Sequence, residues 1–154
     1  MDGDQKSRLT YKVMIDYQMS LAEMIKLGEY DFVDEKITDN LFLIHGTGQH
    51  EVTLVLVCLD YMRPTDKVLE FLNKQGLEPA KIEHLLTLGA LIATSQVQIK
   101  LPVVALGSSL RTVYGSICRY PILQTFDGLR KRKLDLLWEV LFWDVNWLFL
   151  AVDK

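Results

Sequence analysis

Residues 52–59, which read Val-Thr-Leu-Val-Leu-Val-Cys-Leu, decide the fold. From Leu54 onward, both faces of this segment are apolar. A strand of this kind lies inside a sheet that is covered on both sides. The segment therefore predicts a central strand whose two faces are packed against other elements.

Upstream of this strand, the sequence predicts another strand and a short helix. Residues 11–18 alternate apolar with mostly polar side chains, which is the period of a half-buried strand. Ser20 and Glu23 have the spacing of a capping box at the start of a helix. An apolar stripe within residues 21–25 follows, and Gly28 is expected in the left-handed position that ends the helix.

The segment between this helix and the central strand is less regular. Apolar residues near positions 30–32 and 42–44 suggest two short extended pieces on either side of a turn at residues 38–40. The run His-Gly-Thr-Gly-Gln-His at residues 45–50 predicts a hairpin loop, because its glycines can adopt the positive φ of a tight reversal.

Downstream of the central strand, two helices are predicted. One covers residues 64–76 and the other covers residues 79–89, and each begins at a proline and ends at a glycine. Proline is tolerated in a first helical turn because its missing N–H has no partner there in any case. His84 is predicted on the exposed face of the second helix.

The last third of the chain is predicted to be mainly extended. Residues 103–106 form a short buried strand, and residues 112–126 form a strand pair interrupted at Pro121. Residues 134–146 fit both an amphipathic helix and two strands folded at residues 144–146. The composition and the apolar ending at residues 147–152 favour strands.

Composition indicates a single globular domain. The 154 residues are 49% hydrophobic and 24% charged, with 17 Lys and Arg against 20 Asp and Glu. The net charge of −3 argues against a globally basic nucleic-acid binder. We expect a flexible tail at residues 1–9 and one domain at residues 10–154, because no linker or repeat divides the chain. The predicted class is α+β, an antiparallel or mixed sheet with two or three short helices.

Three features predict a cytoplasmic protein. Cys58 and Cys118 are too few and too far apart for a disulfide framework. No apolar run reaches the ~18 residues needed to span a bilayer. The N-terminal segment is polar and lacks the apolar core of a signal peptide. We therefore expect no membrane association.

The metal-binding and nucleophilic residues do not form a known motif. His45 and His50 flank the glycine-containing loop and Glu51 follows, but their spacing matches no zinc motif. We therefore expect no metal and no other cofactor. Ser108 follows a buried strand, but residues 106–110 lack the second glycine of a nucleophile elbow.

The densest charge run is the candidate binding site. It consists of Arg130, Lys131, Arg132 and Lys133. Four cations can hold an anionic partner, and Phe126 and Tyr120 lie near enough in sequence to suggest base stacking. The acidic balance of the chain argues against nucleic acid, and a solvated hairpin tip is the simpler interpretation. Trp138, Trp143 and Trp147 are expected mainly in the core, and one left on the outside would mark an interface.

Several segments are distinctive when taken together. They are KQGLEPA at 74–80, EHLLTLGA at 83–90, LPVVALGS at 101–108 and WLFLAVDK at 147–154, with YDFV at 30–33 and Asp39 upstream. In these segments the chain resembles a group of small uncharacterised proteins that are common in bacteria with reduced genomes. The resemblance implies a terminal core strand at residues 147–154 but no activity. The order of elements is more loosely similar to that of C-type-lectin-like domains. This similarity implies an architecture but no function.

These observations predict a non-catalytic binding or interaction protein, with another protein as the expected partner and the oligomeric state open. The alternative is an enzyme whose site converges from distant loops, with Ser108, His45 and His50 as its candidates. An enzyme should contain a deep polar pocket with perturbed pKa values, whereas a binding module should present a shallow apolar or charged patch.

Overall fold

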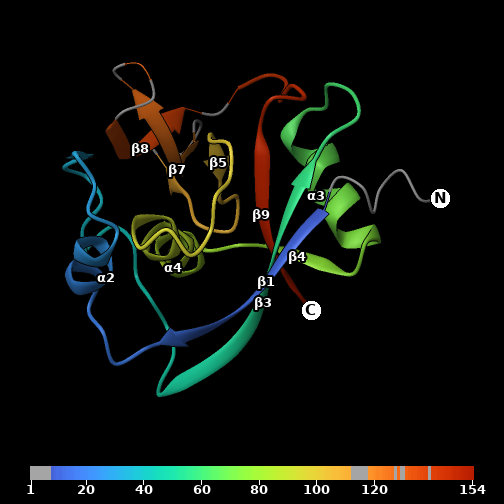
Figure 1. Ribbon diagram of the computed structural model, residues 1–154. Helices are drawn as coiled ribbons and strands as arrows, with labels where there is room; N and C mark the ends of the chain where they lie inside the picture. Colours follow the sequence, from blue (N-terminus) through green and yellow to red (C-terminus); the bar gives the residue numbers. More distant parts are fainter. Residues whose placement is uncertain (1–7, 112–117, 127, 129–130, 139) are drawn as a thin grey trace.

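The computed structural model describes residues 8–111, 118–126, 128, 131–138 and 140–154 (Figure 1). These residues form three helices and a nine-stranded mixed sheet in one domain, which confirms the predicted α+β class. The helices are α2 (Leu21–Leu27), α3 (Thr65–Lys74) and α4 (Ile82–Ala93). The strands are β1 (Arg8–Asp16), β2 (Phe32–Val33), β3 (Gln49–Cys58), β4 (Leu77–Pro79), β5 (Val103–Val104), β6 (Leu110–Arg111), β7 (Cys118–Phe126), β8 (Lys131–Trp138) and β9 (Leu148–Asp153).

The order of strands in the sheet is β1-β3-β9-β5-β7-β8-β2, and β4 and β6 pair with β9 and β7. Most neighbours are antiparallel, whereas β5 with β9 and β2 with β8 are parallel. Strand β3 lies between β1 and β9, and its residues 54–57 are all buried. The prediction of an interior strand with both faces covered is therefore confirmed, although the strand spans Gln49–Cys58 rather than residues 52–59.

Two hydrophobic cores lie on the two faces of the sheet. Helices α2 and α4 lie on one side of the β1-β3-β9 part of the sheet and α3 lies on the other (Figure 1). Leu54 and Leu56 of β3 belong to the core that contains residues of α2 and α4. Val55 and Val57 belong to the core that contains residues of α3. Because successive side chains of a strand point to opposite faces, a strand between two cores must be apolar at every position.

Helix α2 begins as predicted but ends differently. The Glu23 N–H donates to Ser20 Oγ at 3.1 Å and the Ser20 N–H donates to Glu23 Oε1 at 2.8 Å, which confirms the capping box. Gly28 is not left-handed, since its φ is −78°. Glu29 adopts the positive φ of 50° instead. A Cβ on Gly28 would lie 2.2 Å from Cζ of Tyr30, so close packing explains this glycine.

The predicted start and end of α4 are wrong. Pro79 belongs to β4, where it pairs with β9, and the helix begins at Ile82. Gly89 does not end the helix, which continues to Ala93. A Cβ on Gly89 would lie 1.9 Å from the Tyr30 hydroxyl oxygen, so this glycine makes room for the Tyr30 side chain.

Helix α3 agrees with its prediction. The helix spans Thr65–Lys74 after Pro64, and Gly76 follows with a φ of 76°. This φ lies in the left-handed region that favours glycine.

The predicted hairpin loop at residues 45–50 is wrong. Gly48 has a positive φ of 69°, but no strand immediately precedes the loop. The Tyr17 N–H donates to the Gly48 carbonyl at 2.8 Å, so the loop joins the end of β1 and leads into β3. Of the two predicted extended pieces, only β2 forms a strand.

Pro121 does not interrupt a strand as predicted, because β7 continues through it. Its register partner is Leu136 of β8, and its carbonyl accepts a hydrogen bond from the Ala105 N–H at 3.1 Å. Residues 112–117, the first part of the predicted strand pair, lie outside the described residues.

The C-terminal third forms strands rather than a helix, as the composition favoured. However, β8 pairs with β7 and β2, whereas β9 pairs with β3, β4 and β5, so the two strands are not folded onto each other. At the other end of the chain, β1 begins at Arg8, so Arg8 and Leu9 are strand residues rather than part of a tail.

Candidate functional site

The candidate nucleophile Ser108 has a structural role. Its Oγ accepts a hydrogen bond from the Ile82 N–H at 2.8 Å, which satisfies a free donor in the first turn of α4. A Cβ on Gly107 would lie 2.5 Å from the Ala80 carbonyl oxygen, so only glycine allows this loop to approach the segment before α4 so closely. The Gly-Ser sequence therefore holds a loop against the start of α4.

In the part of the chain that the structure describes, the histidines of the glycine-containing loop form no hydrogen bond with Ser108. His50 Nε2 forms a hydrogen bond of 2.6 Å with the Thr47 carbonyl, and the His50 ring meets the Tyr17 ring edge-on. Within the described ranges, no hydrogen bond links Ser108 to His45 or His50. The same ranges contain no group of three or more His, Cys, Asp or Glu residues that could hold a metal ion.

The prediction that His84 is exposed is wrong, because both Glu83 and His84 are buried. The Tyr17 hydroxyl donates to Glu83 Oε2 at 3.0 Å, and the Lys81 N–H donates to His84 Nδ1 at 2.8 Å. Burial lowers the pKa of His84, although the Glu83 charge opposes this shift. Burial, followed by the Glu83 charge and hydrogen bond, raises the pKa of Tyr17 to about 12.

Three of the four residues of the predicted basic site, Lys131, Arg132 and Lys133, lie at the start of β8. Arg130 lies outside the described residues. Lys131 and Lys133 line an open pocket of about 460 Å³ together with Asp31, Phe32 and Phe126. The Lys133 side chain of this pocket has two close partners. Its Nζ lies 3.4 Å from an Asp135 oxygen and 5.7 Å from the Phe126 ring centroid.

Arg132 shares Asp31 with this pocket, but its side chain contacts Glu29 and Tyr30. Its backbone N–H donates to Asp31 Oδ2 at 2.9 Å, and its guanidinium donates to the Glu29 carbonyl at 3.4 Å. The guanidinium also lies over the Tyr30 ring at 5.8 Å. Of the three described cations, Lys131 and Lys133 therefore line the pocket, whereas the Arg132 side chain contacts Glu29 and Tyr30.

The aromatic residues divide between core and surface. Trp143 is fully buried, and its indole N–H donates to Thr65 Oγ1 at 2.9 Å. Tyr120 is also buried, so it cannot stack on a base as the sequence suggested. Trp138 is half exposed and lies over the Arg119 guanidinium at 4.8 Å.

A surface that the sequence analysis missed is formed by two loops. Arg63 and Trp143 form an isolated antiparallel bridge, in which their N–H groups donate to each other's carbonyl oxygens at 3.1 and 2.8 Å. This bridge joins the loop at residues 59–64 to the loop at residues 140–147. Five large apolar side chains are exposed on these loops: Tyr61 (60%), Met62 (56%), Leu141 (84%), Phe142 (54%) and Val145 (49%). We call these five residues the loop-pair surface.

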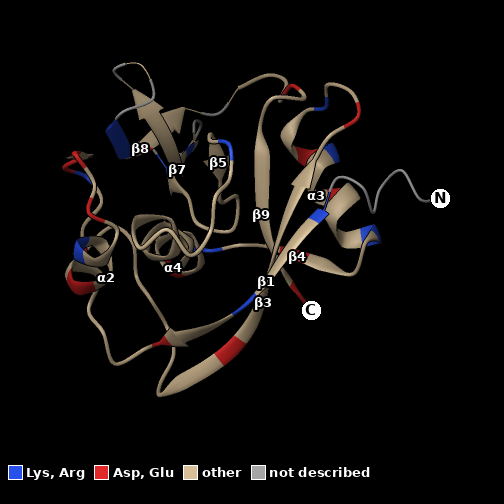
Figure 2. Ribbon diagram, viewed as in Figure 1, with Lys and Arg blue, Asp and Glu red and all other residues tan. Residues whose placement is uncertain are grey.

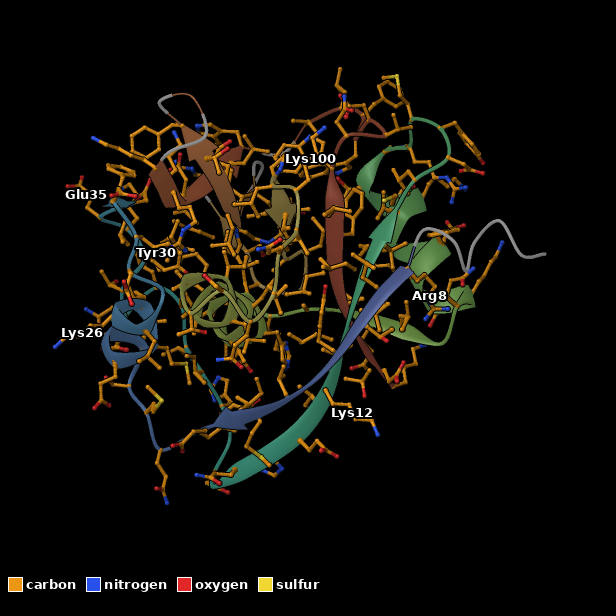
Figure 3. The ribbon with its side chains drawn as sticks, in the orientation of Figure 1. Arg8, Lys12, Lys26, Tyr30, Glu35 and Lys100 are labelled. Atoms are coloured by element: carbon orange, nitrogen blue, oxygen red, sulfur yellow. The ribbon has the colours of Figure 1, made fainter. Side chains whose placement is uncertain are left out.

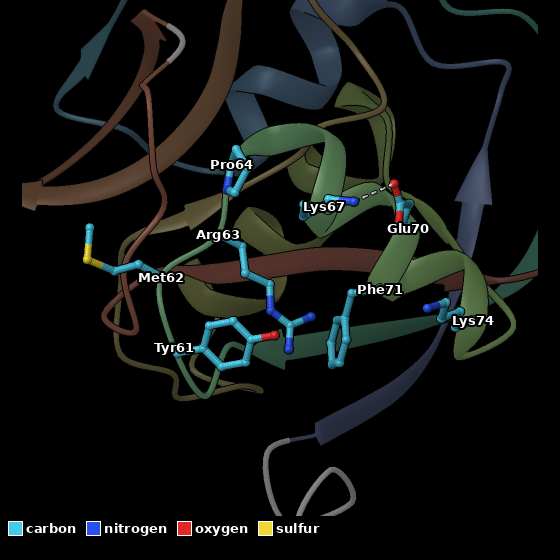
Figure 4. Close-up of a pocket in the computed structure, with 8 residues that line it drawn as sticks. All are labelled: Tyr61, Met62, Arg63, Pro64, Lys67, Glu70, Phe71 and Lys74. Atoms are coloured by element: carbon cyan, nitrogen blue, oxygen red, sulfur yellow. Dashed lines mark hydrogen bonds and ion pairs between the residues drawn. The ribbon is translucent and has the colours of Figure 1, made fainter.

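A pocket of about 530 Å³ adjoins this surface (Figure 4). We call it the arginine pocket, and its lining includes Tyr61, Met62, Arg63, Pro64, Lys67, Glu70, Phe71 and Lys74. The Arg63 guanidinium lies between two rings, with its Cζ 4.4 Å from the centroids of both Tyr61 and Phe71. Cation–π contacts on both sides hold the planar group in one orientation.

The arginine pocket carries more positive than negative charge. Its lining has three cations, Arg63, Lys67 and Lys74, and one carboxylate, Glu70. Lys67 Nζ lies 3.4 Å from a Glu70 oxygen, and Arg63 donates to Asp60 Oδ1 at 3.0 Å. Figure 2 shows charged residues along α3.

The chain matches no family model, no curated protein and no solved structure. The resemblance described above therefore stays a prediction, and any function must be argued from the described surfaces. No helix within the described ranges is long and apolar enough to cross a membrane.

Proposed function

We propose that this protein is a non-catalytic interaction protein that binds a segment of another protein on the loop-pair surface. The observation that carries the proposal is the cluster of five large apolar side chains on two bridged loops, each about half exposed or more. Clustered exposed apolar residues mark interaction sites, whereas single ones are ordinary.

The loops are held in place by the core beneath them. Trp143 is fully buried and meets the Trp147 and Phe149 rings edge-on, at centroid distances of 5.1 and 5.6 Å. Its backbone bridge to Arg63 then fixes the second loop. A surface ordered before binding loses little conformational entropy when a partner docks.

An enzyme built on Ser108, His45 and His50 is the alternative. It has less support, because Ser108 caps α4 and His50 is bonded to the Thr47 carbonyl. Burial raises the pKa of the Cys58 thiol, which disfavours a nucleophilic thiolate. The free thiols of Cys58 and Cys118 also support a reducing compartment, and so a cytoplasmic location.

A selection of random peptides displayed on phage tests the proposal. We expect the wild-type protein to enrich peptides whose binding is lost in the double variant Met62→Ser/Phe142→Ser. The matched control is Met14→Ser/Leu43→Ser, which removes two comparably exposed apolar side chains elsewhere. Near-UV circular dichroism checks that both variants are folded. The proposal is wrong if no peptide is enriched, or if enriched peptides bind both variants equally.

A further inference from the structure

We infer that the arginine pocket binds acidic side chains of the partner segment whose apolar residues dock on the loop-pair surface. The inference rests on the proposed function and names the chemistry of the partner. Tyr61 and Met62 belong to both the surface and the pocket lining, so one bound segment reaches both.

The state of Arg63 provides the first argument. A guanidinium has five N–H donors in a fixed planar fork that matches a carboxylate. Within the described part of the chain, Asp60 is the acceptor that the guanidinium contacts, through one terminal nitrogen, so the other terminal nitrogen keeps its N–H donors. Tyr61 and Phe71 already hold the guanidinium plane, so an incoming carboxylate does not have to order it.

The two lysines of α3 provide the second argument. Lys67 and Lys74 are both exposed, and a separation of seven residues places them on one face of the helix, about 10 Å apart along its axis. An extended segment rises roughly 3.3 Å per residue, so acidic residues about three positions apart would match this spacing. Glu70 and Asp60, the ion-pair partner of Arg63, offset two of the three positive charges and leave an excess of one.

The surroundings of the pocket favour a protein over a nucleic acid. The loop-pair surface shares Tyr61 and Met62 with the pocket, and its other members, Leu141, Phe142 and Val145, offer apolar contact but no phosphate-binding group. A segment that alternates acidic with leucine-like or aromatic residues complements both the arginine pocket and the loop-pair surface. The partner class is therefore an acidic, apolar-rich protein segment.

The experiment measures the affinity of synthetic copies of the enriched peptides by fluorescence anisotropy. In Lys67→Gln/Lys74→Gln at low salt, we expect Kd to rise roughly threefold to tenfold, the effect of losing two exposed ion pairs. Replacing Asp and Glu of the peptide by Asn and Gln should weaken binding to wild type similarly. High salt should reduce both differences, because it screens exposed charges.

Two matched controls remove the same charge elsewhere. Lys12→Gln/Lys26→Gln changes exposed lysines of β1 and α2 whose side chains point away from the protein (Figure 3). Lys131→Gln/Lys133→Gln changes the pocket beside β8. We expect neither to change Kd.

The other results overturn the inference in distinguishable ways. Neutral peptides that need Met62 and Phe142 but not Lys67 and Lys74 would overturn the inference and leave the proposed function intact. Acidic peptides that depend on Lys131 and Lys133 would overturn it in favour of the second pocket. A single-stranded oligonucleotide that binds through Lys67 and Lys74, with no acidic peptide enriched, would show that the ligand is a nucleic acid. Failure to enrich any peptide would contradict the proposed function itself.

Discussion

At the scale of a residue, His84 couples the stability of the fold to pH. Its buried ring accepts the Lys81 N–H through Nδ1, which only the neutral imidazole can do. Burial lowers its pKa below the ordinary value of about 6.5, although Glu83 and Glu78 oppose the shift and Lys81 adds to it. The unfolded chain therefore takes up a proton at a pH where the folded protein does not.

The sign of the pH effect follows from this difference. The stabilisation from neutral His84 is fully present above about pH 6.5 and is lost as the pH falls toward the folded pKa. We expect the free energy of unfolding in urea to fall between about pH 7 and about pH 5.5. The fall should be smaller in His84→Gln, whose amide oxygen can still accept the Lys81 N–H. Equal slopes for the two proteins would contradict the assignment.

At the scale of an element, α4 begins with a cap supplied from a distant part of the chain. Ser108 Oγ is the acceptor for the Ile82 N–H, although the two residues are 26 positions apart. Ser108→Ala should lower the free energy of unfolding by about 0.5–2 kcal/mol, the usual cost of losing a helix cap. Ser109→Ala, at the exposed neighbouring position, should change it little. Chemical denaturation measures both, and equal effects would show that the hydroxyl does not stabilise the helix.

At the scale of the whole molecule, β9 links the two cores. Leu150 belongs to the core with α2 and α4, whereas Phe149 and Ala151 belong to the core with α3. Because one strand serves both, neither core should persist when the other is lost. We expect tryptophan fluorescence, which reports Trp143 and Trp147 in the α3 core together with the exposed Trp138, to follow the same denaturation curve as far-UV circular dichroism. Two separate midpoints would show that the cores unfold independently.

The predictions that succeeded depended on local periodicity and local hydrogen bonding. The apolar run at residues 52–59 predicted a strand between two cores, because only such a strand is apolar at every position. The Ser20 and Glu23 spacing predicted the start of α2, because a capping box joins residues three apart. The α+β class followed from these local patterns.

The predictions that failed depended on contacts between distant segments. Gly28 and Gly89 look like helix ends in sequence, but both make room for Tyr30. Pro79 lies in β4 because β9 pairs with that segment. His84 was predicted to be exposed because nothing in its own helix shows that the start of α4 is buried.

The loop-pair surface also depends on contacts between distant segments. Tyr61 and Met62 on one loop, and Leu141 and Phe142 on the other, form one surface because the Arg63–Trp143 bridge joins their loops. In the sequence these are ordinary apolar residues that any core would use. The sequence by itself determined the strands and helices with local signals and the single α+β domain. Only the tertiary structure decided which apolar side chains stay exposed, because burial depends on where distant segments pack.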